Sequence, residues 1–253
     1  MKIEIIKCLE DNYSYLIIDE KSKSACVVDP SEAEPIIDYV EKNNINLKFI
    51  LNTHHHFDHV GGNKDLKKKY NSKVVGFSGD KERIPEIDII LKDKEIWKEE
   101  KFEAKIFHIP GHTSGHICFN FFNEKLLFTG DTLFSLGCGR IFEGTYEQMF
   151  NSLNLIKTFP KETKIFCGHE YTLKNSEFCL MYDKDNKELK QKIIQNKKRI
   201  KEGFPTIPTT LEDELNMNIF LRSDRKDIQS NLNLINSNPL ETFSKLRDLK
   251  DNF

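Results

Sequence analysis

The chain has 253 residues and a formal net charge of −2, which allows one large domain or two unequal ones with a buried core. The near balance of charge argues against nucleic-acid binding, which usually requires a basic excess, and no run approaches the ~20 apolar residues of a membrane span. Six scattered cysteines without C-x-x-C spacing indicate reduced thiols, and acidic residues within the first apolar stretch exclude a signal peptide, so we expect a cytoplasmic protein.

Short apolar runs separated by turn signals predict strands through the first two thirds of the chain. These strands are residues 3–6, 15–18, 25–28, 49–51, 73–75, 104–109, 116–121, 125–128 and 164–166. Apolar residues at helical spacing predict helices at 32–43, 63–70 and 146–158, the last ended by Pro160. Strands and helices mixed in this order predict an α/β fold with layered sheets.

The pattern changes after Tyr171, where almost no strand signal remains. Residues 187–202 predict a long charged helix that ends at Gly203. A final helix is expected to begin at Asn238, as the N-cap, with Pro239 at its first position. We therefore expect two domains, residues 1–172 and a small helical domain of residues 173–253.

A cluster of polar side chains follows the strand predicted at residues 49–51, in the segment FILNTHHHFDHVGGN. In an extended segment, residues two apart point the same way, so His54 and His56 can hold one ion together. Asp58 and His59 can turn toward a second ion. Zinc-type sites use imidazole and carboxylate ligands, and such groups packed together would be unstable without a cation.

Two neighbouring features of this cluster have other interpretations. His55 occupies an intervening position, so we do not expect it to be a ligand. Gly61 and Gly62 are expected to let the chain turn tightly into the next helix.

Three polar residues far downstream could complete the site. They are His112 in IPGHTSGH, Asp131 in LLFTGD and His169 in IFCGHE. Each follows an apolar strand and a glycine, so they converge if their strands share a sheet edge. A single histidine at a strand end is more often structural, and His116 is expected to begin a strand and face the core or a ligand's partner.

These motifs in this order resemble the metallo-β-lactamase fold: THHHFDH, GH at 111–112, GD at 130–131 and GH at 168–169. The resemblance covers residues 1 to about 170 and implies an αββα sandwich, with Asp29 in a supporting role. LEDNYSYLI, IPGHTSGHICF, GDTLFSLGCGRIFEGT, CGHEYT and the terminal R-x-x-K-D-x-F narrow it to the glyoxalase II (hydroxyacylglutathione hydrolase) family. That family also carries a helical C-terminal domain.

The resemblance implies a binuclear site. It assigns His54, His56 and His112 to the first metal and Asp58, His59 and His169 to the second, with Asp131 bridging both. Two divalent ions per chain are expected, with zinc foremost, although such ligands also accept iron and manganese. Asp58 and Asp131 are the residues expected to act in catalysis.

The resemblance also implies a glutathione site. Arg140 and the terminal pair Arg247 and Lys250 match the basic residues of the family, and Tyr171 matches a tyrosine beside the thiol part. Without the resemblance, the terminal pair would be interpreted as a solvated helix face, although i, i+3 spacing does place both on one face. Phe142 departs from the pattern, because some members have a tyrosine there, and a hydroxyl contact to substrate would be lost.

The implied reaction is hydrolysis of S-(2-hydroxyacyl)glutathione, as S-D-lactoylglutathione, to glutathione and D-lactate, a step in methylglyoxal detoxification. Two metals would share a hydroxide that attacks the thioester carbonyl, with Asp58 orienting it. The expected partner is this small molecule, with neither nucleic acid nor membrane, and the chain is expected to be a monomer.

Several alternatives share the scaffold. A nuclease is disfavoured by the charge, and a lactonase by the terminal basic pair. A persulfide dioxygenase would use one iron and lack the helical domain, so metal counting separates it. A non-catalytic di-metal or redox module would hold metals yet hydrolyse no thioester.

Overall fold

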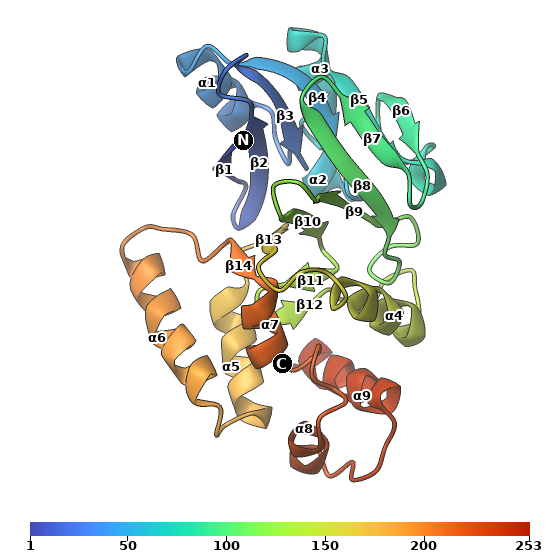
Figure 1. Cartoon of the computed structure of the whole chain (residues 1–253), viewed down its shortest axis with the longest axis vertical. Coiled ribbons are helices and arrows are strands. Elements are labelled where there is room, and N and C mark those ends of the chain that lie inside the picture. The colour runs from blue at the N-terminus through green and yellow to red at the C-terminus, as the bar shows by residue number, and fades with distance from the viewer. The chain divides into compact units, whose positions relative to one another are not determined.

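The computed structural model describes all 253 residues, which form two compact units (Figure 1). Unit 1 comprises Met1–His108 and Ser114–Gly130, and unit 2 comprises Ile109–Thr113 and Asp131–Phe253. No helix is both long and apolar enough to cross a membrane.

A six-stranded sheet forms one layer of unit 1. Its strands, in spatial order, are β1 (Lys2–Cys8), β2 (Asn12–Ile18), β3 (Ser24–Val28), β4 (Asn46–Leu51), β5 (Lys73–Phe77) and β6 (Ile87–Leu91). β1 to β3 are antiparallel, whereas β3 to β6 run parallel. Parallel strands end at the same edge, so the residues that follow β3 and β4 meet there.

Two helices, α1 (Glu34–Lys42) and α3 (Asn63–Tyr70), cover one face of this sheet. Ile36, Val40 and Leu66 are fully or almost fully buried, and they pack in one cluster with Leu16 and Val27 of the strands. Burial of one apolar stripe per helix is what stabilises helices this short.

The second layer of unit 1 is antiparallel, in the order β10 (Leu126–Gly130), β9 (Ile117–Phe121), β8 (Phe102–His108) and β7 (Ile96–Glu99). Aromatic rings join the two layers, since Tyr15 lies 5.5 Å from Phe128 and Phe49 lies 5.3 Å from Trp97 between ring centroids. The predicted α/β class with layered sheets is confirmed.

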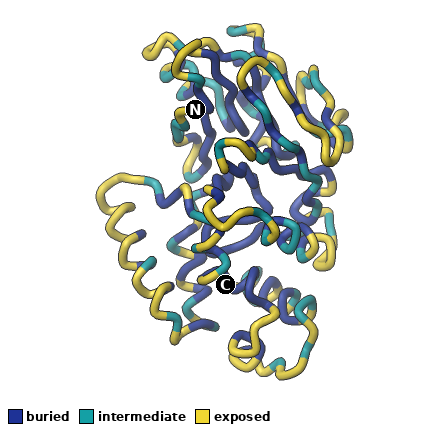
Figure 2. Tube along the Cα trace, viewed as in Figure 1, coloured by how far each residue is buried: buried dark blue, intermediate teal, exposed yellow.

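Unit 2 is mainly helical. Its helices are α4 (Tyr146–Ile156), α5 (Thr172–Tyr182), α6 (Lys187–Lys201), α7 (Leu211–Met217), α8 (Lys226–Asn231) and α9 (Pro239–Asp251). Its short strands are β11 (Leu133–Phe134) with β12 (Gly137–Cys138), and β13 (Lys164–Cys167) with β14 (Thr209–Thr210). Figure 2 shows α6 largely exposed along its length, as its charged sequence predicts.

Unit 1 also contains a short helix, α2 (Phe57–Val60).

The helical character predicted beyond residue 172 is confirmed, with a two-residue strand as the exception. Asn238 caps α9 by accepting from the Glu241 backbone N–H at 2.9 Å, and Pro239 stands in the first turn, as predicted. Helix α5 was not predicted, because it buries polar Asn175 and Ser176 beside apolar residues and so lacks a clear stripe.

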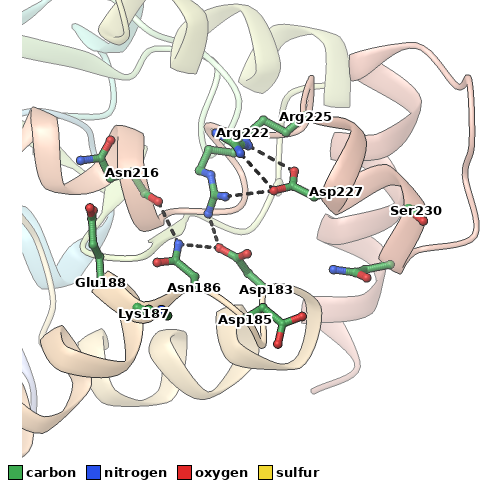
Figure 3. A pocket seen from close by; sticks show the side chains of 11 residues that line it. Asp183, Asp185, Asn186, Lys187, Glu188, Asn216, Arg222, Arg225, Asp227 and Ser230 are labelled. Carbon is green, nitrogen blue, oxygen red and sulfur yellow. Dashed lines mark hydrogen bonds and ion pairs between the residues drawn. The ribbon is translucent and has the colours of Figure 1, made fainter.

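A polar pocket of about 620 Å³ lies among α6, α7 and α8 (Figure 3). Its charged side chains pair with one another: Arg222 binds Asp183 and lies 3.7 Å from Asp227, while Arg225 binds Asp227 through two hydrogen bonds. The Arg222 and Asp183 side chains are only 7% and 9% exposed. This buried pair joins the end of α5 to the turn that precedes α8.

Arg222→Leu is expected to lower the free energy of unfolding by about 3–5 kcal/mol, since it leaves the Asp183 carboxylate buried without its cation. Urea denaturation would measure the loss. Arg225→Leu is the matched control, because the Arg225 side chain is 57% exposed and its ion pair should contribute about 1 kcal/mol or less. Equal losses for the two variants would contradict this account.

Glu214 is a fully buried carboxyl group on α7. Burial raises its pKa from the ordinary value of 4.5 to about 7, against hydrogen bonds from Leu136, Asn218 and Thr209 that lower it. The unfolded chain therefore loses this proton at lower pH than the folded chain, so stability falls as pH rises from 4.5 to about 7.

Glu214→Gln is expected to remove this pH dependence, because the amide does not titrate. Its oxygen can still accept from Leu136 and Asn218, and its NH2 group can donate to the Thr209 hydroxyl oxygen. Between pH 5 and pH 8 the difference in unfolding free energy should shift in favour of the variant by roughly 3 kcal/mol. Denaturation of both proteins across this range would measure the shift. A constant difference would show that Glu214 keeps an ordinary pKa.

Candidate metal centre

The histidine cluster of unit 1 lies where β4 ends. His56 has an extended backbone (φ −58°, ψ 143°) and caps α2, which carries Asp58 and His59. The His54 ring lies 4.7 Å from the His56 ring and 4.2 Å from the His59 ring, between centroids. The structure thus brings together the three histidines that the sequence predicts as ligands from this segment.

Asp29 supports this cluster from the end of β3. Its Oδ2 lies 3.0 Å from Nδ1 of His59 and accepts from the Thr53 hydroxyl at 2.7 Å, while its Oδ1 accepts from the Thr53 backbone N–H at 2.8 Å. An ionised carboxylate can only accept, so Nδ1 of His59 carries the proton and Nε2 is left as the ligand nitrogen.

The same reasoning extends to His54. The Thr53 hydroxyl uses its proton on Asp29, so it accepts from Nδ1 of His54 at 3.0 Å. Nε2 of His54 is then the ligand nitrogen as well. Asp29 thus orients two imidazoles, His59 directly and His54 through the Thr53 hydroxyl.

Asp58 is held by the start of β2. The Asn12 side-chain amide donates to Oδ2 of Asp58 at 3.0 Å and to its backbone oxygen at 3.1 Å. Oδ2 lies 3.6 Å from Nε2 of His59. Asp58 and His59 therefore face one another, as two ligands of one cation would.

The two remaining histidines of this region have other neighbours. His55 places Nδ1 3.2 Å from Oδ2 of Asp80. His116 is buried and stacks on His54, with centroids 4.6 Å apart and an 18° interplanar angle. Gly130 makes room here, since a Cβ at its φ of +46° would lie 2.3 Å from the Thr53 hydroxyl oxygen. The stack restrains the ring plane of His54.

Gly61 has a reason other than the predicted turn. Its φ is an ordinary −58°, but a Cβ there would lie 2.4 Å from the backbone oxygen of Ser31. The glycine is therefore required by a close backbone approach, which seats α2 against the end of β3.

A second cluster lies in unit 2, around Asp131. Nε2 of His112 and Nε2 of His169 lie 3.5 Å and 3.3 Å from the same oxygen, Oδ2 of Asp131. Nδ1 of His112 is 2.7 Å from the backbone oxygen of Arg140, which can only accept, so it carries the proton. One carboxylate oxygen between two imidazole nitrogens fits the donor set of a bridged metal pair.

Two predicted substrate residues border this second cluster. Tyr171 stacks on His169, with centroids 4.8 Å apart and a 3° interplanar angle, and Phe142 meets His112 edge-on at 5.2 Å. Both side chains are exposed. They can therefore offer ring surface to a molecule bound beside the metal ligands.

The three basic residues differ in exposure. The Arg140 side chain is 54% exposed and donates from Nε to Asp251 at 3.2 Å. Arg247 is only 4% exposed, and it donates to the backbone oxygen of Cys138 at 2.7 Å. Nζ of Lys250 lies 4.6 Å from the Phe253 ring centroid. Burial, followed by the neighbouring Arg247, lowers the pKa of Lys250 to about 8.

All six cysteines are buried and free of disulfides. Burial raises the pKa of Cys138 to about 11, although Arg247 opposes this shift. A thiol that stays protonated at neutral pH is a poor nucleophile, so the buried Cys138 is suited to packing and not to nucleophilic attack.

Comparison with known proteins identifies the family. A family model described as the metallo-β-lactamase superfamily matches residues 10–169, and one described as the hydroxyacylglutathione hydrolase C-terminus matches residues 170–253. A hydroxyacylglutathione hydrolase from Pelagibacter ubique is 61% identical over 253 residues, covering 100% of both chains. The chain belongs to the hydroxyacylglutathione hydrolase family. It is thus a hydrolase of the metallo-β-lactamase superfamily, as the motifs predicted.

A second relative of the same family also matches over the whole chain. The hydroxyacylglutathione hydrolase of Methylococcus capsulatus is 43% identical and covers 100% of this chain and 99% of its own. Among solved structures, the BLEG-1 B3 metallo-β-lactamase has a TM-score of 0.69 at 21% identity, over 87% of this chain and 99% of that one. That likeness shows the fold, so the predicted metallo-β-lactamase sandwich with a helical C-terminal domain is confirmed.

Sequence reasoning missed several residues of the centre in this family member. Thr53 and Asn12 orient predicted ligands. Both lie within motifs that carry the resemblance, THHHFDH and LEDNYSYLI, but no role was predicted for either, because a threonine beside a histidine and an asparagine in a strand are common. Asp29 was found only through the resemblance. The position of Thr53, directly before the histidines and just after a buried strand, is the sequence feature that could have indicated its role.

Proposed function

We propose that this chain hydrolyses S-(2-hydroxyacyl)glutathione, as S-D-lactoylglutathione, to glutathione and D-lactate. The observation that carries the proposal is the full-length match to hydroxyacylglutathione hydrolases, at 61% identity in one of them. The family model for the hydroxyacylglutathione hydrolase C-terminus matches residues 170–253, and this segment contains the basic pair Arg247 and Lys250. The second cluster and its bordering rings support the same reaction.

We propose two divalent metal ions, with zinc foremost, held by the residues of both clusters. His54, His56 and His112 would hold the first ion, and Asp58, His59 and His169 the second, with Asp131 shared. The ions would supply a water of near-neutral pKa and polarise the thioester carbonyl. The hydrogen bonds of Nδ1 in His59, His54 and His112 support this assignment. They go to Asp29, Thr53 and the Arg140 carbonyl, so Nε2 of each ring is left as the nitrogen that can bind a metal.

The other residues bind and orient. Asp58, held by Asn12, would orient the attacking water toward the carbonyl carbon. Water adds to that carbon and the C–S bond breaks, so the acyl group leaves as the acid and sulfur as the thiol. Tyr171 and Arg140 would contact glutathione, and Arg247 and Lys250 would serve its carboxylates, which attract guanidinium and ammonium groups.

We further propose that residues 1–172 act as the catalytic domain and residues 173–253 as the substrate-binding domain. The chain would work as a cytoplasmic monomer, in keeping with an Arabidopsis thaliana relative named cytoplasmic that is 43% identical over 258 residues. Phe142 would offer the substrate a ring without a hydroxyl.

A substrate comparison tests the proposal. Purified protein is expected to release D-lactate from S-D-lactoylglutathione and to turn over the D-lactoyl thioester of a simple thiol far more slowly. Elemental analysis should find two metals per chain, where a persulfide dioxygenase would hold one. Thioester turnover that survives complete metal removal would falsify the mechanism. Equal rates on both thioesters would show that the protein does not recognise the glutathione part of the substrate.

A further inference from the structure

The β11–β12 hairpin joins two parts of the second cluster. Leu133 pairs with Cys138, and the backbone N–H of Gly139 donates to the oxygen of Thr132 at 3.1 Å. Asp131 stands just before this hairpin, and Arg140 stands just after it. The Arg140 backbone oxygen accepts from Nδ1 of His112. A movement of the hairpin would therefore displace Asp131 directly and His112 through one hydrogen bond.

The tip of the hairpin is strained. Leu136 has a φ of +58°, in the left-handed region that branched side chains rarely adopt. It is also buried, with 1% of its surface exposed. A residue in this conformation persists only when its surroundings hold it there, so something must fix the tip.

Side chains of α5 and α7 fix it. Glu214 accepts from the Leu136 backbone N–H at 2.8 Å, and Cys179 donates to the Leu136 oxygen at 3.1 Å. Asn218 donates to the Gly137 oxygen at 3.0 Å and to Glu214 at 2.9 Å. Glu214 is therefore the residue that joins the strained N–H and the Asn218 amide in one network.

We propose that Glu214 is a positioning residue, which holds the β11–β12 hairpin in the shape that places Asp131 and His112 for metal binding. Glu214 is fully buried and also accepts from the Thr209 hydroxyl at 2.8 Å, so its carboxyl group is held on every side. It touches neither substrate nor metal ligand and acts through Leu136. The inference rests on the proposed metal site at Asp131.

Metal affinity tests this role. Glu214→Leu removes the acceptor for Leu136 and is expected to weaken Zn²⁺ binding about tenfold, the scale seen when partners of metal ligands are removed. Glu214→Gln keeps an acceptor and should bind Zn²⁺ like the wild type. Competition with a chromophoric chelator would measure both, with thermal unfolding of the metal-free proteins as the stability readout.

Arg222→Leu is the matched control, because it breaks a buried pair with Asp183 instead. It should lower stability and leave Zn²⁺ affinity unchanged. If Glu214→Leu does not fold, Asn218→Ala cuts the same network and should weaken Zn²⁺ binding in the same direction. Unchanged Zn²⁺ affinity in the folded variants would overturn the role of Glu214 and leave the proposed function standing. A wild-type protein that binds no metal would overturn both.

Discussion

Replacing Asp131 with alanine is expected to lower the metal content from the proposed two ions per chain to at most one and to cut kcat/KM at least about 10³-fold. Oδ2 of Asp131 lies 3.5 Å from Nε2 of His112 and 3.3 Å from Nε2 of His169, so alanine would remove the oxygen that we propose as the shared ligand. Elemental analysis and the thioester assay would measure the two losses.

A matched aspartate separates this effect from general damage. Asp227→Asn changes a carboxylate whose partners are Arg222 and Arg225, and it should keep both metals and the wild-type kcat/KM. Asp131→Asn, which retains one neutral oxygen ligand, should fall between alanine and the wild type. Two metals and full activity in Asp131→Ala would refute the bridging role.

The second large effect concerns the basic pair on α9. Lys250→Ala is expected to raise KM about 10- to 100-fold with a much smaller change in kcat, since it would remove the proposed charge-assisted hydrogen bond to a substrate carboxylate, which would be present both before and during the reaction. Lys245→Ala is the control, because Lys245 is an exposed lysine of the same helix. Equal KM values for the two variants would remove Lys250 from the substrate site.

The lowered pKa of Lys250 adds a pH test. With a pKa of about 8, the ammonium group loses its proton as pH rises through 8, and its attraction for a carboxylate is lost with it. KM of the wild type should therefore rise above pH 8, whereas KM of Lys250→Ala should not follow that titration.

Arg247→Ala should also raise KM, but with a loss of stability that Lys250→Ala does not share. Its guanidinium is buried against the Cys138 carbonyl and binds Asp251 at 2.9 Å, so truncation leaves buried polar groups without a donor. Unfolding experiments on both variants would show the difference. A stable Arg247→Ala protein with unchanged KM would exclude Arg247 from both roles.

Much of the first cluster could be predicted because it is local. His54, His56 and His59 stand within six residues, and the two-residue repeat of an extended chain places the first two on one side, as their rings show. The caps of α9 are equally local, since Asn238 and Glu241 are three residues apart. Interactions within one turn or strand depend little on how the rest of the chain folds.

The supports of the centre could not be predicted in the same way. Asp29 reaches His59 across 30 positions, and Asn12 reaches Asp58 across 46, because β2, β3 and β4 are placed side by side in one sheet. Short strands such as β11 and β12 have too few residues for a period to be visible. Such contacts follow from strand order, which local propensity does not encode.

The amino-acid sequence by itself determined the family and the α/β class and supplied the candidate metal ligands, because these depend on residue types at short, regular intervals. Only the tertiary structure decided which imidazole nitrogen each support leaves for a metal, and that Arg247 is buried while Arg140 is exposed. It also placed Glu214 on Leu136, 78 positions away. The physical reason is that orientation and desolvation arise when distant segments pack, and neither exists before they meet.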